Sequence, residues 1–313
     1  MSGFLGAKDF GFLAGGGSGG SSPVSPSLLI IECDTGLNST RRCANNNCAS
    51  GDYATSLGRC NNASGTYTTI SGGYLNTSSS YGSTISGGYN NTTSGSFSFV
   101  GGGLLNNASS YGSTISGGRY NTSSNGYSTT SGGYLNTSSG YLSTISGGCN
   151  NTSSGYFSTI SGGHNNASSG RHSFIGGGFC NTSSNYYTSV VGGLYNNAIE
   201  NSSSIGGGRC NNSCGIYSTI SGGYQNTTFF GSDFSYIGGG RKNTTNGSHA
   251  TISGGYNNTT NSNYAFIGGG NTNTTNSGYT TIGGGLTNII NEDSCYSTIS
   301  GGRNNIICNC YAT

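Results

Sequence analysis

Residues 143–157 read STISGGCNNTSSGYF, and units of this length and pattern recur along most of the chain. The most regular feature of the unit is an aliphatic residue followed by Ser-Gly-Gly or Gly-Gly-Gly, here Ile145. This residue, the anchor, recurs every 15 residues, a period too short for a helical hairpin or a propeller blade. A 15-residue unit suits one coil of a parallel β-solenoid. The sequence therefore predicts an all-β chain of about 17 such coils.

Side chains alternate between the two faces of a strand, so the anchors of successive coils are expected to stack into one buried column. The residue two places before each anchor, most often Ser, should point inward as well, and the glycines after the anchor should form a sharp turn. The period is interrupted by two-residue insertions before Ile237 and Ile299 and by a shortened coil between Leu57 and Ile70. Thr130 occupies one anchor place. The predicted core column contains Ile70, Ile85, Ile115, Ile145, Ile160, Ile175, Ile205, Ile220, Ile252 and Ile282.

An asparagine stands six places after every anchor from Ile70 onward. Stacked asparagines can pass side-chain amide hydrogen bonds from coil to coil and satisfy polar groups that the solenoid buries. Twelve of them also form N-x-S/T sequons, which would favour glycosylation in a secreted protein. We favour the ladder, because Lys8 and Asp9 interrupt the apolar residues 1–13 and argue against a signal peptide. The predicted ladder includes Asn76, Asn91, Asn121, Asn136, Asn151, Asn166 and Asn181.

The composition argues against an enzyme. Of 313 residues, 61 are Gly and only 6 % are charged, with a net charge of +2, which gives no footprint for nucleic acid. No apolar run approaches 18 residues, so no membrane insertion is expected. The three histidines lie in separate coils, Glu292-Asp293 fits a solvated loop, and the eleven cysteines, interpreted as free thiols, lack zinc spacing. We therefore predict no catalytic residue, no metal and no cofactor.

The unit resembles the head repeat of trimeric autotransporter adhesins, the YadA-like left-handed parallel β-roll, whose pattern runs S-x-A-I-G-x-x-A-x-A-x-G. The resemblance covers about residues 43–310 and, in one copy, rests on Ser143, Ile145, Gly147, Asn151, Ser153 and Gly155. It implies a homotrimer of left-handed rolls whose surface serves attachment. The chain departs from that family, because we expect no signal peptide, no heptad stalk and no membrane-anchoring strands. Similar repeats occur in virus and phage fibres, and this form fits the sequence better.

The predicted organisation also suits a fibre. We expect an apolar anchor peptide at 1–13, a Gly/Ser linker with a short strand at 14–32, a cap with irregular first coils at 33–69, the solenoid at 70–305 and a C-terminal cap at 306–313. The anchor peptide, which would dock into a capsid or tail protein, is built on Phe4, Leu5, Phe10, Phe12 and Leu13. These features predict a virion fibre that is made in the host cytoplasm and attaches to a host surface. The alternatives are a bacterial adhesin passenger and, less favoured, an ice-binding solenoid.

Two surface features carry partner predictions. The fourth place after the anchor is rich in Tyr and Arg, which could bind a glycan or a protein on the host surface. These candidates are Tyr74, Tyr89, Tyr134, Arg119, Arg209 and Arg241. In four coils the residue before the anchor is aromatic, and the residue after the anchor is then always Gly. We attribute this glycine to crowding by the ring, and predict that the face meets a neighbouring chain.

Overall fold

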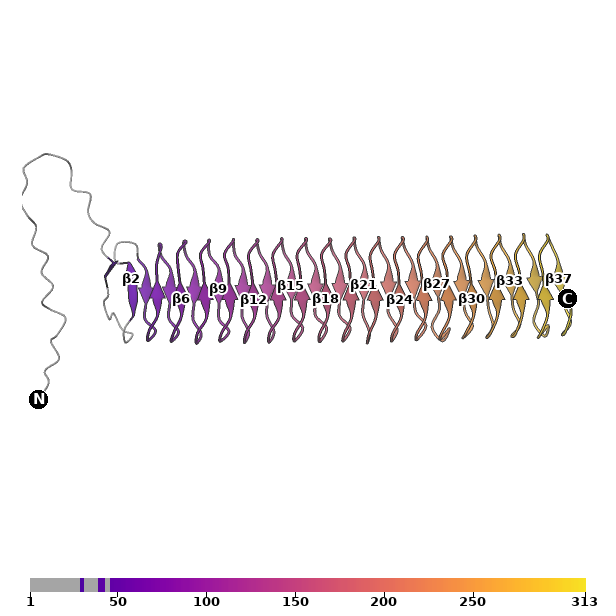
Figure 1. Cartoon of the computed structure of the whole chain (residues 1–313), viewed down its shortest axis with the longest axis horizontal. Helices are drawn as coiled ribbons and strands as arrows, with labels where there is room; N and C mark the ends of the chain where they lie inside the picture. Colours follow the sequence, from indigo (N-terminus) through magenta and orange to yellow (C-terminus); the bar gives the residue numbers. More distant parts are fainter. Residues whose placement is uncertain (1–28, 31–38, 43–45) are drawn as a thin grey trace, which may run out of the picture.

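The computed structural model describes residues 29–30, 39–42 and 46–313, and these form a long, straight rod (Figure 1). The predicted anchor peptide, 1–13, and most of the predicted linker lie outside the described residues. The described chain is all-β, without helix, and winds through eighteen coils of about 15 residues as a parallel β-solenoid. At about 4.8 Å per coil, the solenoid is roughly 85 Å long. None of the described residues forms a helix able to span a membrane.

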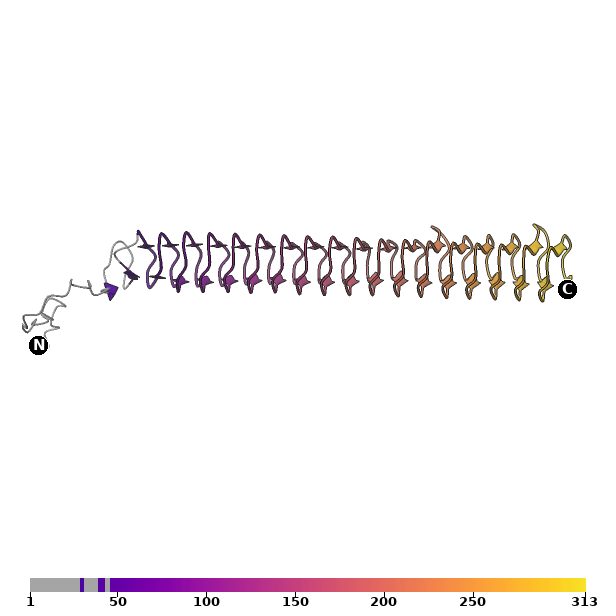
Figure 2. The ribbon, with the colours of Figure 1, turned by 90° about the horizontal axis from the view of Figure 1, so that it is seen from above.

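Each coil contributes one short strand to each of two facing sheets, which lie as separate layers along the rod (Figure 2). Every strand has two residues except β2, which has three. Sheet A consists of β1 (Leu29–Ile30), β2 (Thr40–Arg42), β4 (Thr55–Ser56), β6 (Thr69–Ile70), β8 (Thr84–Ile85), β10 (Phe99–Val100), β12 (Thr114–Ile115), β14 (Thr129–Thr130), β16 (Thr144–Ile145), β18 (Thr159–Ile160), β20 (Phe174–Ile175), β22 (Ser189–Val190), β24 (Ser204–Ile205), β26 (Thr219–Ile220), β28 (Tyr236–Ile237), β30 (Thr251–Ile252), β32 (Phe266–Ile267), β34 (Thr281–Ile282) and β36 (Thr298–Ile299).

Sheet B is an open stack that runs from the first to the last of its strands. It consists of β3 (Cys48–Ala49), β5 (Asn62–Ala63), β7 (Thr77–Ser78), β9 (Thr92–Thr93), β11 (Asn107–Ala108), β13 (Thr122–Ser123), β15 (Thr137–Ser138), β17 (Thr152–Ser153), β19 (Ala167–Ser168), β21 (Thr182–Ser183), β23 (Asn197–Ala198), β25 (Asn212–Ser213), β27 (Thr227–Thr228), β29 (Thr244–Thr245), β31 (Thr259–Thr260), β33 (Thr274–Thr275), β35 (Ile289–Ile290) and β37 (Ile306–Ile307).

Strand pairing keeps equivalent residues of neighbouring coils side by side. In sheet A, Ile160 pairs with Ile145 on one side and Ile175 on the other. The register corrects the placement of the first coils, because Ser56, and not Leu57, pairs with Ile70. Arg41 in turn pairs with Ser56, which adds one coil to the predicted 17. Both early coils lack an aliphatic anchor, so hydrophobic periodicity alone could not place them. All ten predicted core-column isoleucines are fully buried.

The interior is half polar. Ser153 of sheet B faces the anchor column. Its hydroxyl group forms a hydrogen bond across the core with the hydroxyl group of Ser158, with 2.7 Å between the two Oγ atoms. Both serines are fully buried, and the same pair recurs in many coils. Thr130, the exception in the anchor column, is satisfied in the same way, 3.1 Å from the Ser123 hydroxyl. Because each of these buried hydroxyls finds a partner within the coil, a narrow core tolerates them at little cost.

Two sets of turns join the sheets and form the two long edges of the rod (Figure 1). We call the edge that follows each anchor, residues 146–151 in one coil, the glycine edge, and the opposite one, residues 154–158, the return edge. Gly148 on the glycine edge has φ of +89°, and a Cβ placed there would lie 2.2 Å from the carbonyl oxygen of Gly163 in the next coil. This position therefore needs glycine both for its conformation and for the close stacking of coils.

The glycines that accompany aromatic residues have a different cause from the one predicted. A Cβ at Gly101 would lie 3.4 Å from the Phe99 ring, an ordinary contact, but 2.4 Å from the carbonyl oxygen of Ser116 in the next coil. Gly206, whose coil has no such ring, meets the Ser221 carbonyl at the same distance. The next coil, rather than the ring, therefore excludes a side chain. The rings at positions 174, 236 and 266 are 37–40 % exposed in the single chain.

Candidate interaction surfaces along the rod

The asparagine ladder is buried beside the glycine edge and is continuous. Asn166, 1 % exposed, donates from its backbone N–H to Oδ1 of Asn151 at 3.0 Å, and its own Oδ1 accepts from the backbone N–H of Asn181 at 2.9 Å. Its Nδ2 donates to the carbonyls of Gly162 and Gly178, both at 3.0 Å. The same pattern links Asn61 through Asn288, with all seven predicted ladder members within it. Each side chain thus ties one turn to the coils before and after it.

Burial also decides between the two predicted roles of the sequon asparagines. An N-linked glycan is attached through Nδ2, and in the ladder this atom is enclosed and already donates to two carbonyls, as in Asn151. All twelve ladder asparagines within sequons are 0–1 % exposed. In the folded rod these residues can hold the coils together but cannot carry sugar.

The row at the fourth place after the anchor runs along the glycine edge as a third ladder of parallel bridges. The six candidate binding residues lie in this row. Tyr74 and Tyr89 are neighbours, with 5.5 Å between ring centroids, and are 37 % and 41 % exposed. Their outer edges therefore face solvent along the rod.

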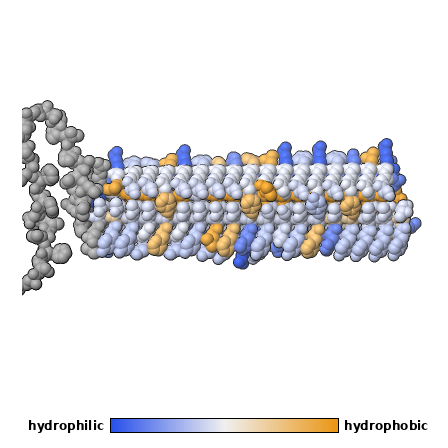
Figure 3. Space-filling model, viewed as in Figure 1, coloured by the Kyte–Doolittle hydropathy of each residue, from blue (hydrophilic) through white to orange (hydrophobic). Residues whose placement is uncertain are grey.

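Arginines in this row lie against neighbouring rings. Arg119 lies 5.9 Å from the Tyr134 ring centroid and 4.8 Å from that of Tyr120. Arg209 and Arg241 lie on either side of Tyr224, at 5.7 and 5.5 Å. These cation–π contacts hold the guanidinium groups along the edge while leaving N–H donors able to reach outward. Strongly hydrophilic side chains project at intervals from a long edge of the rod (Figure 3).

A second aromatic row, which the sequence analysis missed, follows the return edge. From Tyr217 to Tyr311 each of seven coils adds one ring, with centroids 4.8–5.3 Å apart and planes within 17° of parallel. A second run of ring contacts extends from Tyr53 to Tyr187. Asn201 and Ser202 supply no ring and separate the two runs. In the run from Tyr217 to Tyr311 the rings face one another, so only their edges and hydroxyl groups are open to a partner. Between Tyr67 and Tyr141 the ring contacts are instead edge-to-face.

The signal for this row is divided between two adjacent places in the repeat. Where Gly82 or Gly112 stands at the usual ring position, the preceding residue, Tyr81 or Tyr111, supplies the ring. Counting each place separately hides this exchange. A count of coils with a ring at either place would have revealed it.

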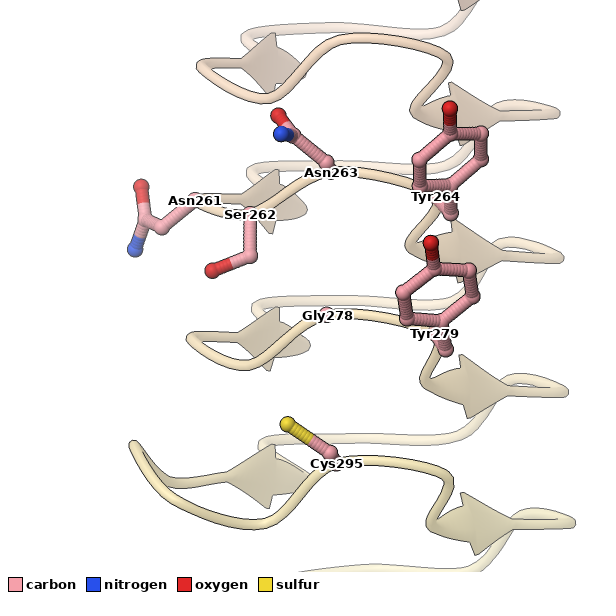
Figure 4. A pocket seen from close by; sticks show the side chains of 7 residues that line it. All are labelled: Asn261, Ser262, Asn263, Tyr264, Gly278, Tyr279 and Cys295. Carbon is pink, nitrogen blue, oxygen red and sulfur yellow. The ribbon is translucent and has the colours of Figure 1, made fainter.

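A shallow pocket opens beside the run of rings that ends at Tyr311 (Figure 4). Its volume is about 440 Å³, and Gly278 leaves the gap, because the equivalent places in the adjacent coils carry Asn263 and Cys295. The remaining lining residues are Asn261, Ser262, Tyr264 and Tyr279. The Asn261 amide bridges Asn246 and Asn276 in a short surface ladder, with bonds of 2.6 and 2.7 Å. The pocket offers amide, hydroxyl and ring edges, which suit weak contacts to a polar ligand.

Groups suited to catalysis do not converge in the described part of the chain. No group of three His, Cys, Asp or Glu residues there could hold a metal ion. His164 lies on the glycine edge, where its ring contacts Phe179, whereas His172 is stacked between Phe157 and Tyr187 on the return edge. Cys214 is buried, and burial raises the pKa of its thiol to about 11, which keeps it protonated.

Comparison with known proteins adds no assignment: no protein-family model and no curated protein matches this chain.

Proposed function

We propose that this chain forms the shaft of a virion fibre, on the capsid or the tail, in which three copies run side by side and mediate attachment to a host surface. One observation carries the proposal: a uniform rod of eighteen coils with two edges of exposed Tyr and Arg side chains. Its length and regularity suit a spacer. Its row of rings and guanidinium groups suits contact with glycan or protein.

Within this proposal, residues 1–13 anchor the fibre in the particle, and the chain reaches the virion after synthesis in the host cytoplasm. Deletion of residues 2–13 should leave the assembly of the rod unchanged and abolish its incorporation into particles. Normal incorporation of the deletion variant would refute the anchor. Sedimentation of the full chain should give a mass of about 95 kDa, three times 31.5 kDa, with strong elongation. A monomer would refute the trimer.

The attachment surface has its own test. Replacing Tyr74, Tyr89 and Tyr134 together by Ser removes three outward ring edges from the glycine edge without touching the core. We expect weaker binding of the purified fibre to host cells. Replacing an equal number of outward threonines of sheet B, such as Thr122, by Ser is the matched control. Equal binding by both variants would remove this edge from the attachment site.

Ice binding is the second candidate. Outward-facing small residues follow sheet B from Thr77 to Thr182 without a ring, at the spacing of the coils. Regular hydroxyl and methyl arrays of this kind can order water. In contrast, Phe99 and Phe174 interrupt the corresponding row of sheet A. Thermal hysteresis of the purified protein would support this function, and its absence would exclude it.

A further inference from the structure

The few charged side chains of the rod are sorted between its two edges. Among the described residues, the glycine edge carries six cations and no carboxylate: Arg59, Arg119, Arg209, Arg241, Lys242 and Arg303. The return edge carries all five described carboxylates, Asp52, Glu200, Asp233, Glu292 and Asp293, together with Arg171. The cross-section is therefore positive on one side and negative on the other.

The charges are also matched in height along the rod. Glu200 lies in the return turn just before the anchor Ile205, and Arg209 lies in the glycine turn just after it. Asp233 and Arg241 flank the anchor Ile237 in the same way. Two further anchor places repeat the arrangement: Ser56 lies between Asp52 and Arg59, and Ile299 between Glu292-Asp293 and Arg303. Each acid–base set shares one coil, so its members differ in height by less than the coil rise of about 4.8 Å.

We infer that the glycine edge of one copy docks on the return edge of the next, with the copies parallel and in register. The inference rests on the trimer of the proposed function and names the surfaces that form it. It assigns the glycine edge to the contact between copies, and is therefore the alternative to the attachment role of Tyr74, Tyr89 and Tyr134, which lie in the same row. Copies related by rotation about an axis parallel to the rod place every residue at the same height in each chain. Arg209 then faces Glu200 of the next copy, and Arg241 faces Asp233. Like charges do not face each other at any position along the rod. Arg119, which has no carboxylate in its own coil, faces the return turn of the next copy that contains Tyr111.

Charge matching selects this arrangement over its alternatives. A shift of one coil would move Arg209 from Glu200 to the turn that contains Tyr217 or Tyr187. The best antiparallel arrangement, with the coil of Ser56 opposite that of Ile299, would match three acid–base sets, against four in the parallel register. Between the charges, both edges present rings, and Tyr and Arg are the side chains enriched in protein interfaces. The rings thus supply contact area, and the charges set direction and register.

Disulfide cross-linking tests the register in the full chain. Cys210 lies on the glycine edge just after Ile205, and Ser202 lies on the return edge just before it, on the opposite side of the same chain. Oxidation of the Ser202→Cys variant should therefore link the introduced thiol of one copy to Cys210 of the next and give covalent trimers on a non-reducing gel. In the control variant His249→Cys, the facing glycine turn contains no cysteine, and no covalent trimer should form.

Charge reversal tests the same contact without a new bond. Arg209→Glu should raise the dissociation constant of the trimer about tenfold or more, and combining it with Glu200→Arg should restore the native value. Arg119→Glu, which has no facing carboxylate, is the matched control and should leave trimer affinity within about threefold. Circular dichroism verifies that each variant folds. A native trimer without cross-linking at position 202, or equal effects of Arg209→Glu and Arg119→Glu, would overturn the edge-to-edge contact and leave the proposed fibre standing. A native monomer would overturn both.

Discussion

Removing one amide from the asparagine ladder gives a sharp test of what holds the coils together. In Asn166→Ala the backbone N–H of Asn181 loses its only acceptor in the structure, Oδ1 of Asn166 at 2.9 Å. The carbonyl of Gly162 loses the donor Nδ2. The carbonyl of Gly178 loses the same donor but keeps the backbone N–H of His164 at 2.9 Å.

The expected loss follows from these contacts. A buried donor without a partner costs about 1–3 kcal/mol, and the carbonyl of Gly162 adds about 1–2 kcal/mol. We therefore expect Asn166→Ala to lower the free energy of unfolding by about 2–5 kcal/mol. Thr152→Ala, an exposed substitution in sheet B, is the control and should cost less than about 1 kcal/mol.

A near-isosteric variant adds a pH dependence. In Asn166→Asp the carboxylate can still accept from Asn181, but its second oxygen faces the Gly162 and Gly178 carbonyls. Burial and these oxygens should raise the folded-state pKa of the carboxyl above its unfolded value of about 3.9. The stabilising protonated form is therefore fully present below that value and is lost as the pH rises through the folded pKa. The variant should be less stable than Asn166→Ala at pH 7 and should recover on acidification.

Thermal unfolding followed by circular dichroism at pH 5 and pH 7 measures both effects. Amide hydrogen exchange at Asn181 should report the loss locally in Asn166→Ala, because that substitution removes the acceptor of its N–H. If Asn166→Ala is no less stable than Thr152→Ala, or if Asn166→Asp shows no dependence on pH, the ladder does not carry the stability assigned to it.

Three further predictions concern the core, the turn and a thiol. Ile160→Ala should cost about 2–5 kcal/mol and Ile160→Val about 0.5–1.5 kcal/mol in chemical unfolding, and equal losses would argue against a packed column. In Gly163→Ala the added Cβ would lie 2.3 Å from the carbonyl oxygen of Gly178, so this variant should not fold to a soluble protein. In the control variant Gly72→Ala the added Cβ would have no neighbour within 4 Å, so this protein should remain soluble. Cys214, with its pKa raised to about 11, should resist alkylation at pH 8 while exposed cysteines react. Its contribution to stability should decline as the pH rises from about 9 to 11, because the buried thiol then ionises more readily in the unfolded chain. Rapid alkylation of Cys214 in the folded protein would contradict its burial.

The sequence predicted the fold wherever a coil has an aliphatic anchor. From Ile70 to Ile299 one hydrophobic residue per 15 identified the strand, its inward face and its stacking partner. The signal failed in the early coils, where Ser56 and Arg41 occupy the anchor place. The sequence pattern therefore placed the anchor of that coil at the neighbouring Leu57, whereas the strand register pairs Ser56 with Ile70 and leaves Leu57 outside the core column.

The surfaces were less accessible to prediction. The Tyr and Arg of the glycine edge share one place in the repeat and were identified, whereas the return-edge rings alternate between two places and were missed. The glycine that follows Phe99 was identified correctly, but its cause, a carbonyl of the next coil, depends on a backbone distance that no sequence pattern reports. Predicting that Glu200 and Arg209 lie on opposite edges likewise requires knowledge of the path of the chain.

The strict coil-to-coil pairing has a consequence for how the chain folds. Most parallel sheets fold slowly, since their strands join residues far apart in sequence. Here partners such as Asn151 and Asn166 are 15 residues apart in a chain of 313, a separation of about 0.05 of its length. That value lies below the range of about 0.07–0.12 typical of helical bundles. Each coil can dock on the one before it as soon as it is complete, so this all-β rod has the contact order of a fast-folding protein.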